Sequence, residues 1–189
     1  MKTATLITFL FFYYSTYCQN FKSKNFEIKK LSPNVYAAIA LPGGSAVCNA
    51  GVIDLGEAVL VVDPFITPAA AVELKQFIAA VIKKPVKYVV NSHSHNDHIR
   101  GNQVFASATI IATPLMRQII KKHEPEEIAD EKKYVPARVK YYDSLPLSKN
   151  KWQAEEDAIW KGYFKSIVQS HAILKTTLPN LVFNDSIDH

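Results

Sequence analysis

The sequence is short of cysteine, glycine and long apolar runs, and each shortage excludes a class of protein. Its 189 residues include only two cysteines, so a disulfide-rich scaffold is excluded. Six glycines and an aromatic fraction of 11% argue against a low-complexity or disordered chain. After residue 14, no run is apolar and long enough to cross a bilayer. The remaining possibility is one globular domain, for which a hydrophobic content of 48% supplies a core.

Charge of one sign is not concentrated anywhere in the chain. The formal net charge is +5, but basic residues stand beside acids, as in Lys121–Glu127. We interpret that stretch as a solvated, charge-mixed surface, and no nucleic-acid-binding motif accompanies it. The sequence therefore predicts no nucleic-acid partner.

Residues 1–18 are predicted to be a signal peptide. Lys2 gives a positive start, the apolar segment Ala4–Tyr14 is too short for an ordinary transmembrane helix, and cleavage is expected just before Gln19. An uncleaved anchor or a buried N-terminal helix are the alternatives, and a lipid anchor on Cys18 has weak support. The expected product is exported, periplasmic or extracellular, without a stable membrane span after signal removal.

The apolar patterns predict an α/β fold with helices packed on a mixed sheet. One helix is expected to begin at Thr67-Pro68 and to end before Pro85, a second to run from Thr113-Pro114 to about Lys122, and a third to cover residues 151–175. The aromatic stripe of the third helix is expected to pack against the sheet, and Cys48 to be a small core residue. Strands are expected at residues 26–30, 35–40, 46–55, 58–62, 86–90, 109–112 and from 181 onward.

A histidine-rich motif follows the strand predicted at residues 86–90. His93, His95, Asp97 and His98 form the pattern His-x-His-x-Asp-His, which holds three of the six histidines within six positions. At a strand end, positions i and i+2 point the same way, so His93 and His95 can address one metal ion, and the turn beyond can present two more ligands. Imidazole nitrogen and carboxylate oxygen suit Zn²⁺. A solvated polar loop is the alternative interpretation.

The segment YVVNSHSHNDHIRGNQVF resembles the signature of the metallo-β-lactamase superfamily, which includes glyoxalase II-like hydrolases as well as β-lactamases. The segments around Asn49–Asp54 and Val61–Asp63 resemble its first strands, so the likeness covers roughly residues 26–105. It implies the N-terminal part of an αββα sandwich. It also implies hydrolysis of a small molecule with a carbonyl, such as a lactam, ester or thioester, by a zinc-bound hydroxide. Because position 98 is His rather than Arg, β-lactam cleavage is not implied.

The resemblance also assigns roles to residues, for one or two zinc ions. His93 and His95 would bind a first ion, and Asp97 and His98 a second. Asp97 would in addition take part in proton transfer. Asp63 would hold the orientation of a ligand, although a cap or turn former at the strand end is an equally good interpretation of it.

The downstream ligand motifs of the family are not found in this sequence. The later histidines, His123, His171 and His189, lack the expected glycine contexts and are not expected to be ligands. We therefore expect residues 24–189 to be a metallo-β-lactamase-like domain without its C-terminal part, with weak zinc binding and low activity. A non-catalytic zinc-binding remnant, or a half-domain completed by a partner chain, is the alternative, and the oligomeric state is left open.

Overall fold

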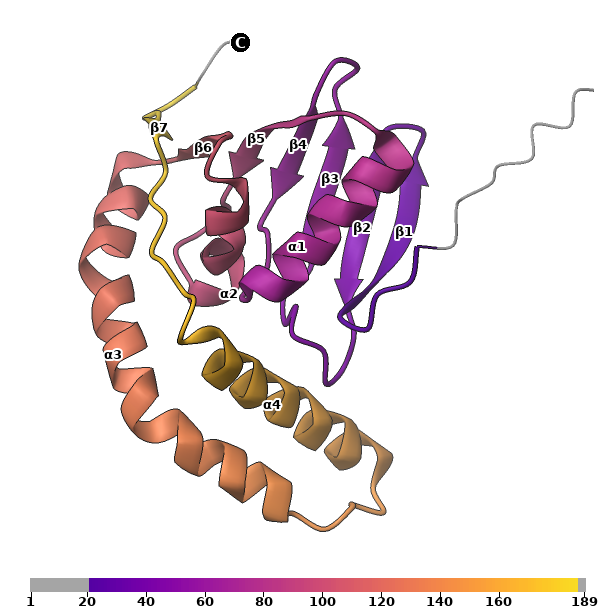
Figure 1. Cartoon of the computed structure of the whole chain (residues 1–189), viewed down its shortest axis with the longest axis vertical. Coiled ribbons are helices and arrows are strands. Elements are labelled where there is room, and N and C mark those ends of the chain that lie inside the picture. The colour runs from indigo at the N-terminus through magenta and orange to yellow at the C-terminus, as the bar shows by residue number, and fades with distance from the viewer. Residues whose placement is uncertain (1–20, 187–189) are drawn as a thin grey trace, which may run out of the picture.

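The computed structural model describes residues 21–186, which form one mixed sheet with helices packed beside it (Figure 1). The predicted signal peptide and His189 lie outside the described residues. The sheet has seven strands in sequence order. They are β1 (Phe26–Ser32), β2 (Val35–Ala40), β3 (Ala50–Asp54), β4 (Val59–Val62), β5 (Val86–Val90), β6 (Thr109–Ala112) and β7 (Leu181–Val182).

The sheet changes direction at β4. Strands β1 to β4 are an antiparallel meander, whereas β4, β5, β6 and β7 pair in parallel. The predicted mixed sheet is therefore confirmed, and the strands expected at 86–90 and 109–112 have the predicted bounds. The strand expected at 46–55 is shorter, because Val47 has a φ of 69° and the backbone becomes extended only at Ala50.

One face of the sheet carries the main core. Val52, Val61, Val89 and Ile110 lie in register on neighbouring strands and are almost fully buried. Helix α1 (Pro68–Phe77) covers this face and contributes Leu74 and Phe77, among other residues. Its predicted start is confirmed, because Thr67 Oγ1 accepts a hydrogen bond from the Ala70 amide at the helix N-terminus. A turn of π-helix (Ile78–Ile82) completes the connection to β5.

Helix α3 (Pro114–Ser144) is much longer than predicted. The sequence suggested an end near Lys122, but the helix continues through Pro125 and Pro136. An internal proline removes a hydrogen bond and bends a helix, and α3 is visibly curved (Figure 1). The buried side chains of Glu124, Glu131 and Val135 hold its middle against the rest of the protein, so tertiary contacts outweigh the local preference to stop.

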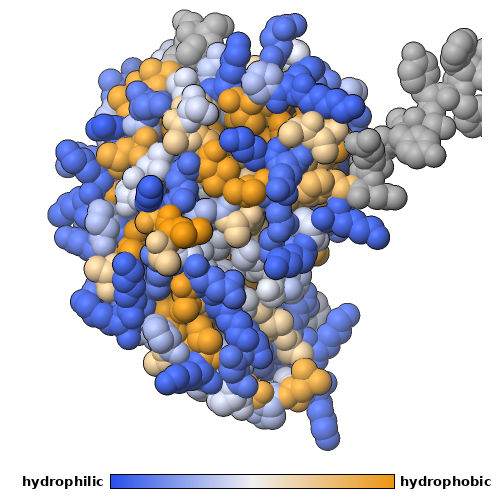
Figure 2. Space-filling model, in the orientation of Figure 1, coloured by the Kyte–Doolittle hydropathy of each residue, from blue (hydrophilic) through white to orange (hydrophobic). Residues whose placement is uncertain are grey.

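Helix α4 (Lys151–Ser170) packs against α3 rather than laying its aromatic stripe on the sheet, so that prediction was wrong. Phe164 and Ile167 are buried with Val135 and Ile66, whereas Trp152 is 80% exposed and Trp160 is 40% exposed. Figure 2 shows hydrophilic side chains over most of the visible surface, with separate hydrophobic patches between them.

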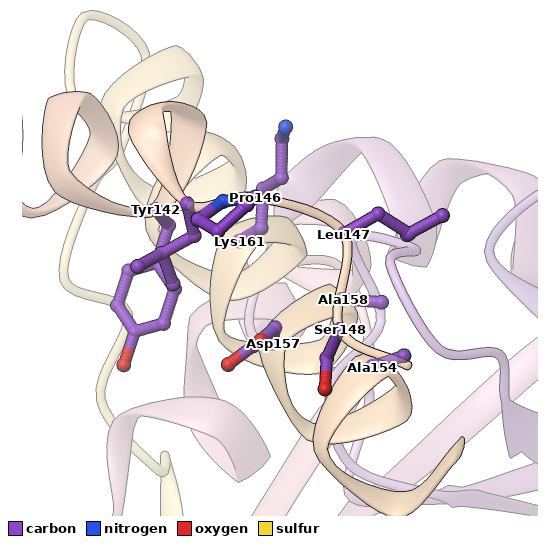
Figure 3. A pocket seen from close by; sticks show the side chains of 9 residues that line it. Tyr142, Pro146, Leu147, Ser148, Ala154, Asp157, Ala158 and Lys161 are labelled. Atoms are coloured by element: carbon purple, nitrogen blue, oxygen red, sulfur yellow. The ribbon is translucent and has the colours of Figure 1, made fainter. Parts of the chain in front are cut away.

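The connection between α3 and α4 forms a shallow pocket of about 210 Å³ (Figure 3). Tyr142 and Pro146 belong to the α3 side and the connection, and Asp157 and Lys161 to α4. None of its lining residues belongs to the His-rich motif, so this pocket is separate from the candidate site.

The chain returns to the sheet after α4. The Ile110 amide of β6 donates a hydrogen bond to Asn180 Oδ1 (2.8 Å) across a sequence separation of 70. Within residues 21–186, no helix combines the length and apolar character needed to cross a membrane.

Candidate metal centre

The His-rich loop begins where β5 ends, at the edge to which the parallel strands point their carboxyl ends. Asn91 is buried, and its side-chain amide donates to the backbone oxygen of His98 (3.0 Å). Asn91 and Asn102 also exchange two hydrogen bonds (3.0 and 2.9 Å). These bonds tie the strand end to both following turns, α2 (Asn96–Ile99) and a 3-10 turn (Arg100–Phe105). The loop is thereby folded back on itself.

The folded loop brings the four predicted ligands together. One ligand atom each from His93, His95 and Asp97 lies within 4.8 Å of the other two. The ring of His98 lies 4.0 Å from that of His93, centroid to centroid, and its Nε2 is 3.2 Å from Asp97 Oδ2. The family resemblance implied one ion for His93 and His95 and another for Asp97 and His98. In the structure, Asp97 belongs to both groups of possible ligands.

Asp63 lies directly beneath the loop. Its two carboxylate oxygens accept hydrogen bonds from the backbone amide (2.8 Å) and hydroxyl (2.6 Å) of Ser92. Asp63 Oδ2 also lies 3.0 Å from His98 Nδ1. The carboxylate is thus placed to hold the His98 ring, the role that the family resemblance implied.

The donor atoms of the loop fit a metal ion. His98 Nδ1 lies 3.0 Å from Asp63 Oδ2, without the alignment of a full hydrogen bond, and His98 Nε2 lies 3.2 Å from Asp97 Oδ2. Three imidazoles and a carboxylate on one short loop are the donor set that Zn²⁺ prefers.

Cys48 is the site residue that sequence reasoning missed. It is buried, as expected of a core residue, but its Sγ donates to the backbone oxygen of Asp97 (2.8 Å). Its sulfur forms a second ligand group with Asp97 and His98, within the same 4.8 Å limit. Burial, followed by the negative charges of Asp97 and Asp63, raises the pKa of the Cys48 thiol far above its ordinary value. Without a cation nearby, the sulfur therefore carries a proton.

A buried charge cluster fastens the loop to α3. Arg100 donates to Glu124 Oε1 (2.7 Å) and lies 2.9 Å from Glu131 Oε2, with all three side chains at most 3% exposed. Asn96, between two predicted ligands, donates to Glu127 Oε1 (2.7 Å) and to Glu131 Oε1 (3.2 Å). The prediction of a solvated surface at Lys121–Glu127 was therefore wrong for Glu124. Glu124 and Glu131 are buried whereas Glu127 is exposed, and the seven-residue spacing of the buried pair was the signal for a buried face.

Unbalanced negative charge marks this cluster. Burial raises the pKa of Glu124, and Arg100 only partly opposes this effect. Burial likewise raises the pKa of Glu127, with the charge of Glu131 adding to it. Three carboxylates therefore share one arginine beside the loop, which favours a site that accepts cations.

Gly101 allows the loop to approach the core closely. A Cβ at this position would lie 1.7 Å from the Pro64 backbone oxygen, so only glycine fits. The Gly101 amide donates to the Phe65 backbone oxygen (2.9 Å). The glycine that follows the histidine motif thus has a packing role.

The later histidines lie away from the described ligand groups. His123 is exposed on α3, with Nδ1 3.7 Å from Glu126. His171 is largely buried, and its Nε2 lies 3.4 Å from Glu131 Oε2. Within residues 21–186, neither belongs to a group that could hold a metal ion.

The family to which the sequence belongs is consistent with a metal site in this loop. The family model of the metallo-beta-lactamase superfamily matches residues 43–168, which include the whole loop and Cys48. The chain belongs to the metallo-beta-lactamase superfamily. It is a superfamily of metal-dependent hydrolases.

Two solved structures are similar to the chain. A metallo-beta-lactamase from Pontibacter korlensis is 19% identical, with a TM-score of 0.46 over 53% of this chain and 49% of that one. A metallo-beta-lactamase from Erythrobacter litoralis is also 19% identical, with a TM-score of 0.45 over 52% of this chain and 46% of that one. The chain therefore spans about half the length of these structures.

Proposed function

We propose that this protein is a zinc-dependent hydrolase of small molecules with a carbonyl group. One observation carries the proposal: ligand atoms of His93, His95 and Asp97 converge within 4.8 Å in a member of the metallo-beta-lactamase superfamily.

The residues of the loop would bind the metal, transfer a proton and position a ligand. His93, His95 and Asp97 would hold one zinc ion, and Asp97 and His98 would face a second. When bound, zinc supplies the positive charge that polarises a carbonyl and activates water. The side chain of Asp97 is 26% exposed, so it can reach both water and substrate and can carry a proton between them. Asp63, which is held by Ser92, would keep the His98 ring in place.

The substrate class is supported by the recess beside His93. A space of about 340 Å³ adjoins Ser92 and His93 and is walled by Leu115, Met116 and Ile119 of α3, among other residues. Apolar walls next to polar ligands suit a compound with an apolar part and one reactive polar group. We propose an ester, thioester or lactam whose apolar part lies against these three side chains.

Export is a further part of the proposal. Its support is the charged and apolar pattern of residues 1–18. N-terminal sequencing of the protein recovered outside the cytoplasm should find a mature chain that begins near Gln19. An intact N-terminus on the recovered protein would reject cleavage.

The test of the activity combines metal analysis with turnover. The purified protein should bind zinc and hydrolyse at least one of nitrocefin, an aryl ester and a thioester. A His93→Ala/His95→Ala variant should lose both properties, and His123→Ala, an exposed histidine outside the loop, should lose neither. Zinc binding without turnover would favour the non-catalytic module. An activity per chain that rises with protein concentration, together with an increase in the molecular mass of the protein in solution, would favour assembly with a partner chain.

A further inference from the structure

Cys48 contacts the part of the loop that carries Asp97 and His98. Its Sγ, a carboxylate oxygen of Asp97 and a ring nitrogen of His98 all lie within 4.8 Å of one another. Cys48 is only 8% exposed, and its sulfur also lies 3.9 Å from the backbone oxygen of Asp63. The sulfur is therefore buried beside Asp63, Asp97 and His98.

The backbone fixes this position of the sulfur at a cost in strain. Val47, directly before Cys48, has a φ of 69°, a conformation that β-branched residues rarely adopt. Packing opposes the strain, because Val47 lies against the buried cluster of Phe164, Ile167 and Ile66. The Cys48 amide also donates to the Ala46 backbone oxygen (3.0 Å). Helix α4 thus holds the segment that presents the thiol.

Coordination chemistry gives the sulfur a role. Catalytic zinc sites usually have three protein ligands, and Asp97 and His98 supply only two. Among the residues that the structure describes, Cys48 is the only further donor grouped with them. A thiolate, an imidazole and a carboxylate together suit Zn²⁺. Asp63 beside His98 Nδ1 leaves the other ring nitrogen, 3.2 Å from the Asp97 carboxylate, to face the ion.

We propose that Cys48 is a metal ligand, and that its thiolate, Asp97 and His98 hold the second zinc ion of this centre. The inference rests on the proposed function, because it concerns the same metal centre. On binding, the sulfur–hydrogen bond breaks, the proton leaves to solvent and a sulfur–zinc bond forms. The centre then consists of two sets of three protein ligands that share Asp97.

Cobalt spectroscopy tests this assignment directly. The full chain is prepared with Cys18→Ser, which leaves Cys48 as its one thiol, and is titrated with Co²⁺. We expect a near-ultraviolet thiolate-to-cobalt charge-transfer band and about two ions per chain, given two sets of three ligands. Adding Cys48→Ser should abolish that band and lower the affinity for the second ion on the order of 100-fold. The visible cobalt bands of the His93, His95 and Asp97 set should remain.

The outcomes separate this inference from the proposed function. Two cobalt ions without a thiolate band would overturn the inference and leave the hydrolase proposal standing. No metal binding by the Cys18→Ser protein would overturn both. If Cys48→Ser does not fold, the decision passes to zinc X-ray absorption of the Cys18→Ser protein, where a sulfur shell at about 2.3 Å is expected. Its absence there would exclude the ligand.

Discussion

Arg100 Nη1 lies 2.9 Å from Glu131 Oε2, and both side chains are almost fully buried. This pair joins the His-rich loop to the middle of α3. Glu131 Oε1 also accepts from Asn96, which stands between His95 and Asp97 in the sequence. A carboxylate 31 positions beyond Arg100 therefore helps to define where the predicted metal ligands lie.

Glu131→Gln should destabilise the protein. The substitution replaces one of the two carboxylates that contact the buried Arg100 by an amide with a single acceptor oxygen. Arg100 keeps Glu124, but a buried donor loses its partner, and such a loss typically lowers the free energy of unfolding by about 1–3 kcal/mol. Urea denaturation at neutral pH measures the loss. The matched control is Glu126→Gln on the same helix, whose side chain is 70% exposed, and its effect should be within about 0.5 kcal/mol. Equal stability of the two variants would contradict the role of the buried pair.

Glu127→Gln should have the opposite effect at neutral pH. Because the folded-state pKa of Glu127 is raised, the folded protein binds more protons than the unfolded chain between the ordinary and the raised pKa. Wild-type stability therefore falls as the pH rises through that window. The variant keeps an oxygen for Asn96 and has no carboxylate whose pKa folding raises, so it should gain stability over wild type as the pH rises from 4 to 7. A stability difference that is independent of pH would reject this explanation.

Asp63→Asn should weaken metal binding without unfolding the protein. The amide keeps one oxygen acceptor but loses the charge beside His98 Nδ1, and changes of this kind typically lower metal affinity about 10–100-fold. Competition with a chromophoric chelator gives the affinity. Asp130→Asn is the matched comparison, because Asp130 is 66% exposed on α3 beside Lys133, and it should leave the metal affinity unchanged. Equal metal affinity in Asp63→Asn and Asp130→Asn would contradict the proposed role of Asp63.

Two aromatic residues of α4 should respond very differently to truncation. Phe164→Ala removes a ring packed with Ile66, Val135 and Ile167, and a loss of about 3–5 kcal/mol in the free energy of unfolding is expected. Trp152→Ala should change it by less than about 0.5 kcal/mol, because that ring is 80% exposed. Thermal or urea unfolding of both variants compares them. A large effect at Trp152 would show that the ring is covered in solution.

The sequence predicted those features whose signals are local. The strand at 86–90 is a β-branched run bounded by Pro85, and the four ligands of the loop lie within a six-residue span that follows it. Cys48 could not be placed in this way, because its contact with Asp97 spans 49 positions and depends on how two loops meet. The same holds for the buried face of α3, whose partner Arg100 lies in another element. The sequence also predicted an end of α3 near Lys122, and tertiary contacts carry the helix on to Ser144.

The bond between Ile110 and Asn180 has a consequence for how this architecture can vary. The chain leaves the sheet at β6 and returns to it at the adjacent strand β7, so helices α3 and α4 form an insertion between two neighbouring strands. Additional residues near Leu147, in the exposed connection between α3 and α4, would leave the pairing of the strands unchanged. A single deletion just before Leu181 would instead turn the side chains of β7 to the opposite face of the sheet.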